Sequence, residues 1–117
     1  MLSLPALVRI LLYTQPTDMR KGFDSLAALV REELGQDPLS GHLFVFRSRR
    51  GNRVKLLFWD RDGYCLVYKR LERGNFRFPV VSADQRSAEV SDQELSLLLW
   101  GIDPASVRRQ KRYTRPA

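Results

Sequence analysis

The stretch that decides the fold runs from residue 43 to residue 79 and reads LFVFRSRRGNRVKLLFWDRDGYCLVYKRLERGNFRFP. Branched and aromatic residues alternate in it with turn-forming residues at hairpin spacing, which is typical of consecutive antiparallel strands. The stretch also holds ten Lys or Arg and three Asp or Glu, so its net charge of +7 equals that of the whole chain. Because aromatic residues are interleaved with these cations, the segment is not a disordered basic tail. The sequence therefore predicts a cationic sheet.

Three turn signals divide this stretch into strands: Arg50-Gly51-Asn52, Asp60-Arg61-Asp62-Gly63 and Arg73-Gly74-Asn75. They predict four consecutive antiparallel strands whose even-numbered residues face one apolar core, because side chains alternate between the two faces of a strand. A three-residue loop keeps even residues opposite even residues. The register at the middle turn is undecided, since Asp62-Gly63 alone favours a two-residue loop, which would place even residues opposite odd residues.

In that register the odd-numbered side chains form an outward face. Like charges lie opposite one another on this face, for example Arg49 and Arg53. Like charges across a ladder are mildly destabilising. We therefore interpret the face as a surface for an anionic partner, most often nucleic acid; a solvated face whose side chains splay apart is the alternative. Its candidate binding residues are Arg47, Arg49, Arg53, Lys55, Lys69 and Arg77, and Arg50 in the adjoining turn is a further candidate.

The segment before this stretch predicts a strand and a helix. The apolar run from Leu7 to Tyr13 reads as a first strand. Asp18 then caps a helix whose apolar stripe, at helical spacing, runs from Phe23 to Leu34. Gly35 is the expected stop. This helix should lie across the sheet.

The segment after the cationic stretch predicts a short edge strand at Glu89-Val90 and a second helix. Ser91 and Glu94 form a capping box that opens the helix, which ends at Gly101. Asp103-Pro104 suits the start of another short helix. The expected fold is α+β: an antiparallel sheet of four to five strands, one packed helix, a C-terminal helix and a basic tail. We expect a single domain over 1–107 and a basic extension over 108–117.

Composition narrows the class of protein. A chain of 117 residues with 44% apolar and 28% charged residues fits one soluble domain. The single cysteine, Cys65, excludes a disulfide framework or a cysteine-rich zinc site and suits a reducing cytoplasm. The start lacks the pattern of a signal peptide, and no apolar stretch is long enough to span a membrane. We expect no cofactor and no metal.

The last ten residues carry five basic and no acidic side chains. This tail is interpreted as a basic extension that lies along a DNA backbone, where each neutralised phosphate releases counterions. A helix-turn-helix over 91–111, bending at Gly101, is the alternative. The candidate contacts in the tail are Arg108, Arg109, Lys111 and Arg112.

Arg20 and Lys21 stand in the first turn of the predicted helix, where cations oppose the helix dipole. Local helix energetics do not favour them there. Together with the free amides of the helix start they would suit a phosphate or an acidic side chain of a partner. An internal salt bridge from Arg20 to Asp24 is the alternative.

Catalysis is not indicated. Four acidic residues could be considered for a metal-dependent nuclease centre, namely Asp18, Asp24, Asp60 and Asp62. Turn geometry accounts for the last two and helix capping for the first. The only histidine, His42, has no suitable serine motif nearby, and Cys65 alternates with apolar residues as a small buried side chain does.

Several separated blocks resemble a known family: residues 13–24 (YTQPTDMRKGFD), 41–47 (GHLFVFR), 55–63 (KLLFWDRDG) and 68–72 (YKRLE). In order and spacing they are similar to the small TnpB accessory protein of the insertion sequence 66 family, and the resemblance covers about residues 7 to 103. It implies a bacterial mobile-element protein, encoded beside a separate transposase and needed for transposition without chemistry of its own.

The expected function is thus that of a non-enzymatic accessory protein for DNA transposition, whose partners are the element's transposase and DNA held by non-specific backbone contacts. The rival from another class is a protein-only adaptor whose cationic surface meets an acidic surface of the transposase. RNA binding is a third possibility, but it needs exposed stacking aromatics, and only Trp59 stands out on the cationic face. The step of transposition and the oligomeric state stay open.

Overall fold

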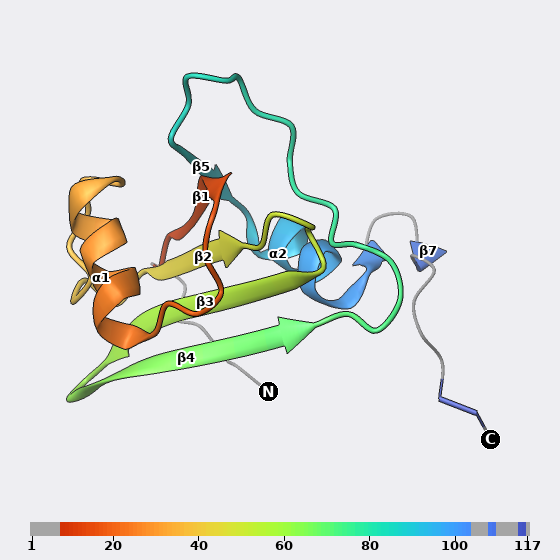
Figure 1. Ribbon diagram of the computed structural model, residues 1–117, viewed down its shortest axis with the longest axis horizontal. Coiled ribbons are helices and arrows are strands. Elements are labelled where there is room, and N and C mark those ends of the chain that lie inside the picture. The colour runs from red at the N-terminus through yellow and green to blue at the C-terminus, as the bar shows by residue number, and fades with distance from the viewer. Residues whose placement is uncertain (1–7, 104–107, 110–114, 117) are drawn as a thin grey trace.

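The computed structural model, which describes residues 8–103, 108–109 and 115–116, has an α+β fold built on a five-stranded sheet (Figure 1). The strands are β1 (Ile10–Pro16), β2 (Leu43–Arg47), β3 (Arg53–Asp60), β4 (Gly63–Arg70) and β5 (Ser87–Val90), in the spatial order β4-β3-β2-β1-β5. The helices are α1 (Phe23–Glu32) and α2 (Asp92–Trp100). Two short strands, β6 (Ile102–Asp103) and β7 (Arg108–Arg109), pair apart from the sheet.

The expected α+β class is confirmed, but the sheet is mixed rather than antiparallel. β1 runs parallel to β2, whereas the other neighbouring strands are antiparallel. The connection from β1 to β2 passes through α1, as a parallel pair requires a crossover. The expected edge strand at Glu89-Val90 is confirmed as part of β5, which pairs with β1.

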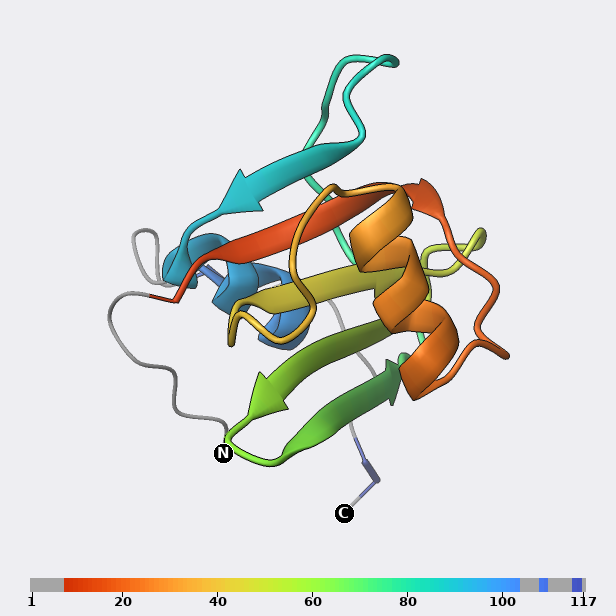
Figure 2. The same ribbon diagram turned by 90° about the vertical axis from the view of Figure 1, so that its left-hand side faces the viewer.

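Both faces of the sheet are covered, which overturns the expectation of one apolar and one cationic face. Figure 2 shows α1 in front of the sheet and α2 behind it. Leu26 and Val30 of α1 pack on one face against Phe44, while Leu95 and Leu98 of α2 pack on the other. Consecutive apolar residues such as Leu43 to Phe46 are all buried because each face has its own core.

The register differs from the expected one at both hairpins. Phe46 lies opposite Lys55, and β3 and β4 are joined by the two-residue loop Arg61-Asp62, closed by the pair Asp60 and Gly63. Even-numbered residues of β3 therefore lie opposite odd-numbered residues of both neighbouring strands. At the middle turn, the alternative of a two-residue loop is correct. A one-residue slip moves every side chain to the other face, and this slip places Lys55 among core residues.

The expected fourth strand of the cationic stretch is wrong. Residues 71–86 leave the sheet after β4 and travel to β5 on the far side. Phe76 is buried in the core on the α2 face, and its backbone N–H donates to the carbonyl of Gly51 at 2.8 Å. The aromatic residues of this segment thus fill the core from a loop.

The helix termini show which local signals were correct. The Ser91 and Glu94 capping box is confirmed, with Glu94 N–H donating to Ser91 Oγ at 3.1 Å, and Gly101 ends α2 at φ +67°. Gly35 follows α1 at φ +61°, as expected. The cap of α1 is Gly22 rather than Asp18, because the helix begins at Phe23.

The C-terminal segment is not a helix-turn-helix where it is described. β6 pairs antiparallel with β7, so Arg108 and Arg109 lie in a strand and not in a recognition helix. The proposed short helix after Asp103 falls on residues 104–107, outside the described positions. Within the described parts of the chain, neither helix is long and apolar enough to cross a membrane.

Candidate functional site

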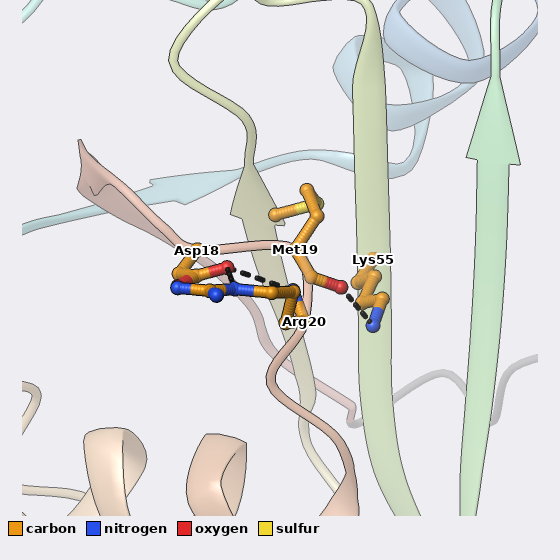
Figure 3. A network of polar contacts seen from close by, with 4 residues as sticks. All are labelled: Asp18, Met19, Arg20 and Lys55. Atoms are coloured by element: carbon orange, nitrogen blue, oxygen red, sulfur yellow. Dashed lines mark hydrogen bonds and ion pairs between the residues drawn. The ribbon is translucent and has the colours of Figure 1, made fainter.

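The cations of the stretch from 43 to 79 do not share one surface. Lys55 is only 6% exposed and points to the α1 face. Its Nζ donates to the carbonyl oxygen of Met19 at 2.7 Å (Figure 3). It also donates to the carbonyl oxygen of Lys21 at 2.7 Å and lies 4.6 Å from the centroid of the Tyr68 ring. The expectation that Lys55 projects into solvent on a binding face is wrong, because its ammonium is used to hold the backbone after β1.

Lys69 and Arg47 also make contacts within the fold. Lys69 Nζ donates to the carbonyl oxygen of Leu99 near the end of α2 and lies 4.4 Å from the Trp100 ring centroid. A cation is favourable at a helix C-terminus. Arg47 donates two hydrogen bonds to the carbonyl oxygen of Thr14, at 2.8 and 3.2 Å. These side chains support the structure, and Lys69 lies on the opposite face from Lys55.

Four of the remaining arginines meet in a cleft. The loop after β1 and the loop between β2 and β3 enclose a hollow of about 430 Å³. We call it the arginine cleft; its lining residues are Thr17, Asp18, Met19, Arg20, Ser48, Arg49, Arg50, Asn52 and Arg53. The fold thereby joins Arg20 to Arg49, Arg50 and Arg53, although these residues are far apart in the sequence.

The loop after β1 is fixed at three points. Thr17 N–H donates to the carbonyl of Arg47 at 2.8 Å, and Lys21 N–H donates to that of Asp18 at 3.1 Å. The third point is the Lys55 ammonium, which donates to the carbonyl oxygens of Met19 and Lys21. A buried ammonium must be hydrogen-bonded, so Lys55 and this loop depend on each other. The loop therefore presents Arg20 from a defined backbone.

Arg20 contacts a carboxylate inside the cleft. Its Nη2 lies 2.6 Å from Asp18 Oδ2, and its backbone N–H donates to Asp18 Oδ1 at 2.9 Å. The hydrogen bond from the Arg20 side chain, followed by that from its backbone, holds the pKa of Asp18 well below its usual range. The alternative of a salt bridge from Arg20 to Asp24 is therefore wrong, because Arg20 pairs with Asp18 instead. The Arg20 side chain is 91% exposed, so one side of its guanidinium faces solvent.

The loop between β2 and β3 supplies Arg49 and Arg50, and Arg53 is the first residue of β3. Gly51 adopts φ +77°, a conformation that favours glycine, and its N–H donates to the Ser48 carbonyl at 3.1 Å. Ser48 Oγ accepts from Arg53 N–H at 3.1 Å. The turn is thus held by backbone and hydroxyl groups and not by the arginine side chains.

The cleft is strongly positive. Its lining includes four arginine residues and one acidic residue, Asp18. Among the described residues, no Asp or Glu forms an ion pair with Arg49 or Arg50. A second hollow of about 280 Å³ is lined by Arg53, Tyr68, Arg70 and Glu72, so Arg53 belongs to both. Cationic groups therefore continue from the cleft toward β4.

Other candidate residues lie elsewhere. Arg77 is exposed in the segment after β4, and Lys21 is half-buried beside the cleft without lining it. The side chains of Arg108 and Arg109, and the whole of Lys111 and Arg112, fall outside the described positions.

The residues considered for catalysis do not converge. Within the described residues, no group of three or more His, Cys, Asp or Glu side chains is arranged to hold a metal ion. His42 Nδ1 accepts a hydrogen bond of 3.0 Å from the backbone N–H of Arg9, which is a structural contact. Cys65 is partly exposed in β4. The cleft offers cations and hydrogen-bond donors, which are the groups that bind anions.

Sequence reasoning found the four cleft arginines but not their grouping. It missed Thr17, Ser48, Asn52 and Arg70, which line the two hollows. One available signal was the pattern of strand, helix and strand, which predicts a parallel pair and so brings the end of β1 to the end of β2.

These features define a small α+β protein with an arginine-lined cleft beside its sheet. The chain belongs to the family described as IS66 Orf2-like protein, whose model matches residues 8–109. The expected family is thus confirmed, and this membership indicates an accessory protein associated with transposition.

Two relatives come from Sinorhizobium fredii (strain NBRC 101917 / NGR234). The chain is 49% identical to the uncharacterized protein y4hO over an alignment of 96 residues, and this alignment covers 82% of each chain. It is 42% identical to the uncharacterized protein y4jC over an alignment of 112 residues, which covers 94% of each chain. No solved structure matches the chain.

Proposed function

We propose that the chain is a non-enzymatic accessory protein of transposition that holds DNA by its phosphate backbone in the arginine cleft. The observation that carries the proposal is the convergence of Arg20, Arg49, Arg50 and Arg53 on one hollow. Guanidinium groups bind phosphate oxygens in a bidentate geometry and keep their charge at all physiological pH values. Family membership supplies the biological setting.

The proposal concerns backbone contacts rather than base reading. Phosphate contacts position a protein on DNA without reading sequence. Arg53 lines both the cleft and the second hollow, so it is available for a phosphate beside the one held in the cleft. We place the basic extension over 108–117, including Arg108, Arg109, Lys111 and Arg112, as a further backbone contact, and the transposase as the protein partner in the cytoplasm.

A rival function is a protein-only adaptor that binds an acidic surface of the transposase. One observation favours it: the cations gather in a compact cleft rather than over a broad sheet face. A carboxylate already occupies part of this cleft, since Asp18 pairs with Arg20 at 2.6 Å. An acidic side chain of a partner could bind the other arginines in the same manner.

The test is a gel shift with random duplex DNA and, separately, with element ends. The double variant Arg49→Ala/Arg50→Ala should weaken binding to both DNAs by about tenfold or more, since each arginine contributes a phosphate contact. The matched control is Arg31→Ala/Arg73→Ala, which removes two exposed arginines outside the cleft. If wild-type protein binds no DNA at low salt yet co-purifies with the transposase, the adaptor function is correct.

A further inference from the structure

β4 is an outer strand of the sheet, and it is neither short nor interrupted by a proline or a bulge. Among the described residues only β3 pairs with it (Figures 1 and 2). Its eight residues follow one unbroken register and contain no proline. Free backbone groups at a sheet edge attract other strands, so soluble proteins usually shorten or interrupt such edges. β5 at the other edge has four residues.

The middle of β4 is also uncharged. Residues 64–68 read YCLVY, and Val67 and Tyr68 are 41% and 49% exposed. Charges occur toward its ends: Asp62 precedes the strand, and Lys69 and Arg70 are its last two residues. An uncharged stretch of this kind on an open edge indicates a surface that another strand covers.

The direction of the backbone groups in β4 follows from one hydrogen bond. Leu71 N–H donates to the carbonyl of Asn52 at 2.8 Å, which marks this pair as hydrogen-bonded across the ladder. Hydrogen-bonded and non-hydrogen-bonded pairs alternate along antiparallel strands. The odd-numbered residues of β4 therefore bond to β3, and its even-numbered residues direct their N–H and C=O groups to the open edge.

This alternation limits how two copies of β4 can pair about a two-fold axis. Residues with outward backbone groups must oppose residues of the same kind, so the axis passes through a residue position. Near the middle of the strand, Leu66 and Val67 are the two choices. An axis at Leu66 brings Asp62, in the loop before β4, to the end of the second copy's strand near Arg70, whereas an axis at Val67 brings it near Glu72. Opposite charges favour the first register.

We propose that β4 pairs antiparallel with β4 of a second copy of this chain about an axis at Leu66. Tyr64 then lies opposite Tyr68 of the second copy, and each Arg70 meets an Asp62. Arg70 bonds Glu72 of its own chain at 2.9 Å, but both side chains are more than half exposed, so the guanidinium is accessible to a second carboxylate. The two sheets become one, and both open β4 edges are covered.

Charge exchange tests this pairing. The dimer should be reversible, because one strand edge buries less surface than a stable interface needs. Asp62→Arg and Arg70→Asp should each weaken self-association about tenfold or more in sedimentation equilibrium, since both symmetric pairs become repulsive. The double variant should restore it to within about threefold of the wild-type value. A new ion pair within one chain cannot explain restored self-association of the double variant, because Asp62 and Arg70 lie at opposite ends of β4.

The matched control is Asp84→Arg/Arg73→Asp, which exchanges two exposed charges outside β4 and should leave self-association unchanged. A wild-type protein that stays monomeric up to its highest soluble concentration would overturn the proposal. So would a double variant that associates no better than the single variants.

Oxidative cross-linking tests the register. With the axis at Leu66, Cys65 opposes position 67 of the second copy at a Cα separation of about 4.5 Å, within disulfide reach. Val67→Cys should therefore form a cross-linked dimer, and Cys65→Ser/Val67→Cys should not. Cross-linking of the second variant would place the axis at Val67 and refute the proposed register. Absence of cross-linking in both would refute the pairing itself.

Discussion

Lys55 Nζ and the carbonyl oxygen of Met19 are joined by a hydrogen bond of 2.7 Å that ties the centre of the sheet to the loop carrying Arg20 (Figure 3). The bond makes a buried cation part of the cleft's scaffold rather than part of its binding surface. It also explains why a lysine stands between the core residues Val54 and Leu56. Substitutions at Lys55 should therefore affect both stability and binding.

Lys55→Met should lower the free energy of unfolding by about 2–3 kcal/mol, because the carbonyl groups of Met19 and Lys21 lose a charged donor. Denaturant unfolding measures this change. Arg73→Met, at an exposed position, is the control and should stay within about 0.5 kcal/mol of wild type. DNA affinity should also fall, since the loop carrying Arg20 is no longer held. An unchanged stability would show that the ammonium does not support the loop.

Asp18 should titrate at unusually low pH. Because Arg20 lowers its pKa in the folded protein, its stabilising contribution is complete above the ordinary aspartate pKa of about 3.9 and is lost as the pH falls below that value. A carboxyl NMR titration should give a midpoint well below about 3.9, and Arg20→Ala should return it toward that value. A normal midpoint in wild type would contradict the ion pair.

Asp18→Asn should strengthen DNA binding several-fold. The variant removes the one carboxylate from the cleft lining and frees the Arg20 guanidinium for phosphate. Fluorescence anisotropy with a labelled duplex measures the affinity. Asp24→Asn, an exposed acid in the first turn of α1, provides the comparison and should change affinity less. Weaker binding by Asp18→Asn would mean that the carboxylate orients Arg20 productively.

Ser91→Ala should destabilise the protein by about 1 kcal/mol. The substitution removes the hydroxyl that accepts from Glu94 N–H at 3.1 Å and so opens the capping box of α2. Thermal unfolding provides the measurement, and Ser82→Ala in the exposed loop before β5 is the control. DNA affinity should not change, because α2 does not line the cleft.

The elements that sequence could predict are those with local signals. The apolar stripe of Leu26, Ala27 and Val30 and the capping box at Ser91 depend on residues three or four positions apart. The hairpin from β3 to β4 likewise follows from Asp60 to Gly63. Such signals need no knowledge of the rest of the chain.

The face of each cation could not be predicted in the same way. Whether Lys55 points to solvent or to the core depends on which parity both hairpins adopt, and on α2 covering the second face from far along the chain. Loop length alone left that parity undecided. The arginine cleft depends in turn on the parallel pairing of β1 with β2, a non-local contact.

The most direct test of the account is the salt dependence of duplex DNA binding by wild type and by Arg49→Ala/Arg50→Ala. A plot of log K against log salt should have a slope that is shallower by about 1.8 in the variant, because two phosphate contacts are lost. Arg31→Ala/Arg73→Ala should keep the wild-type slope. Equal slopes for wild type and the cleft variant would contradict the claim that the arginine cleft binds the DNA backbone.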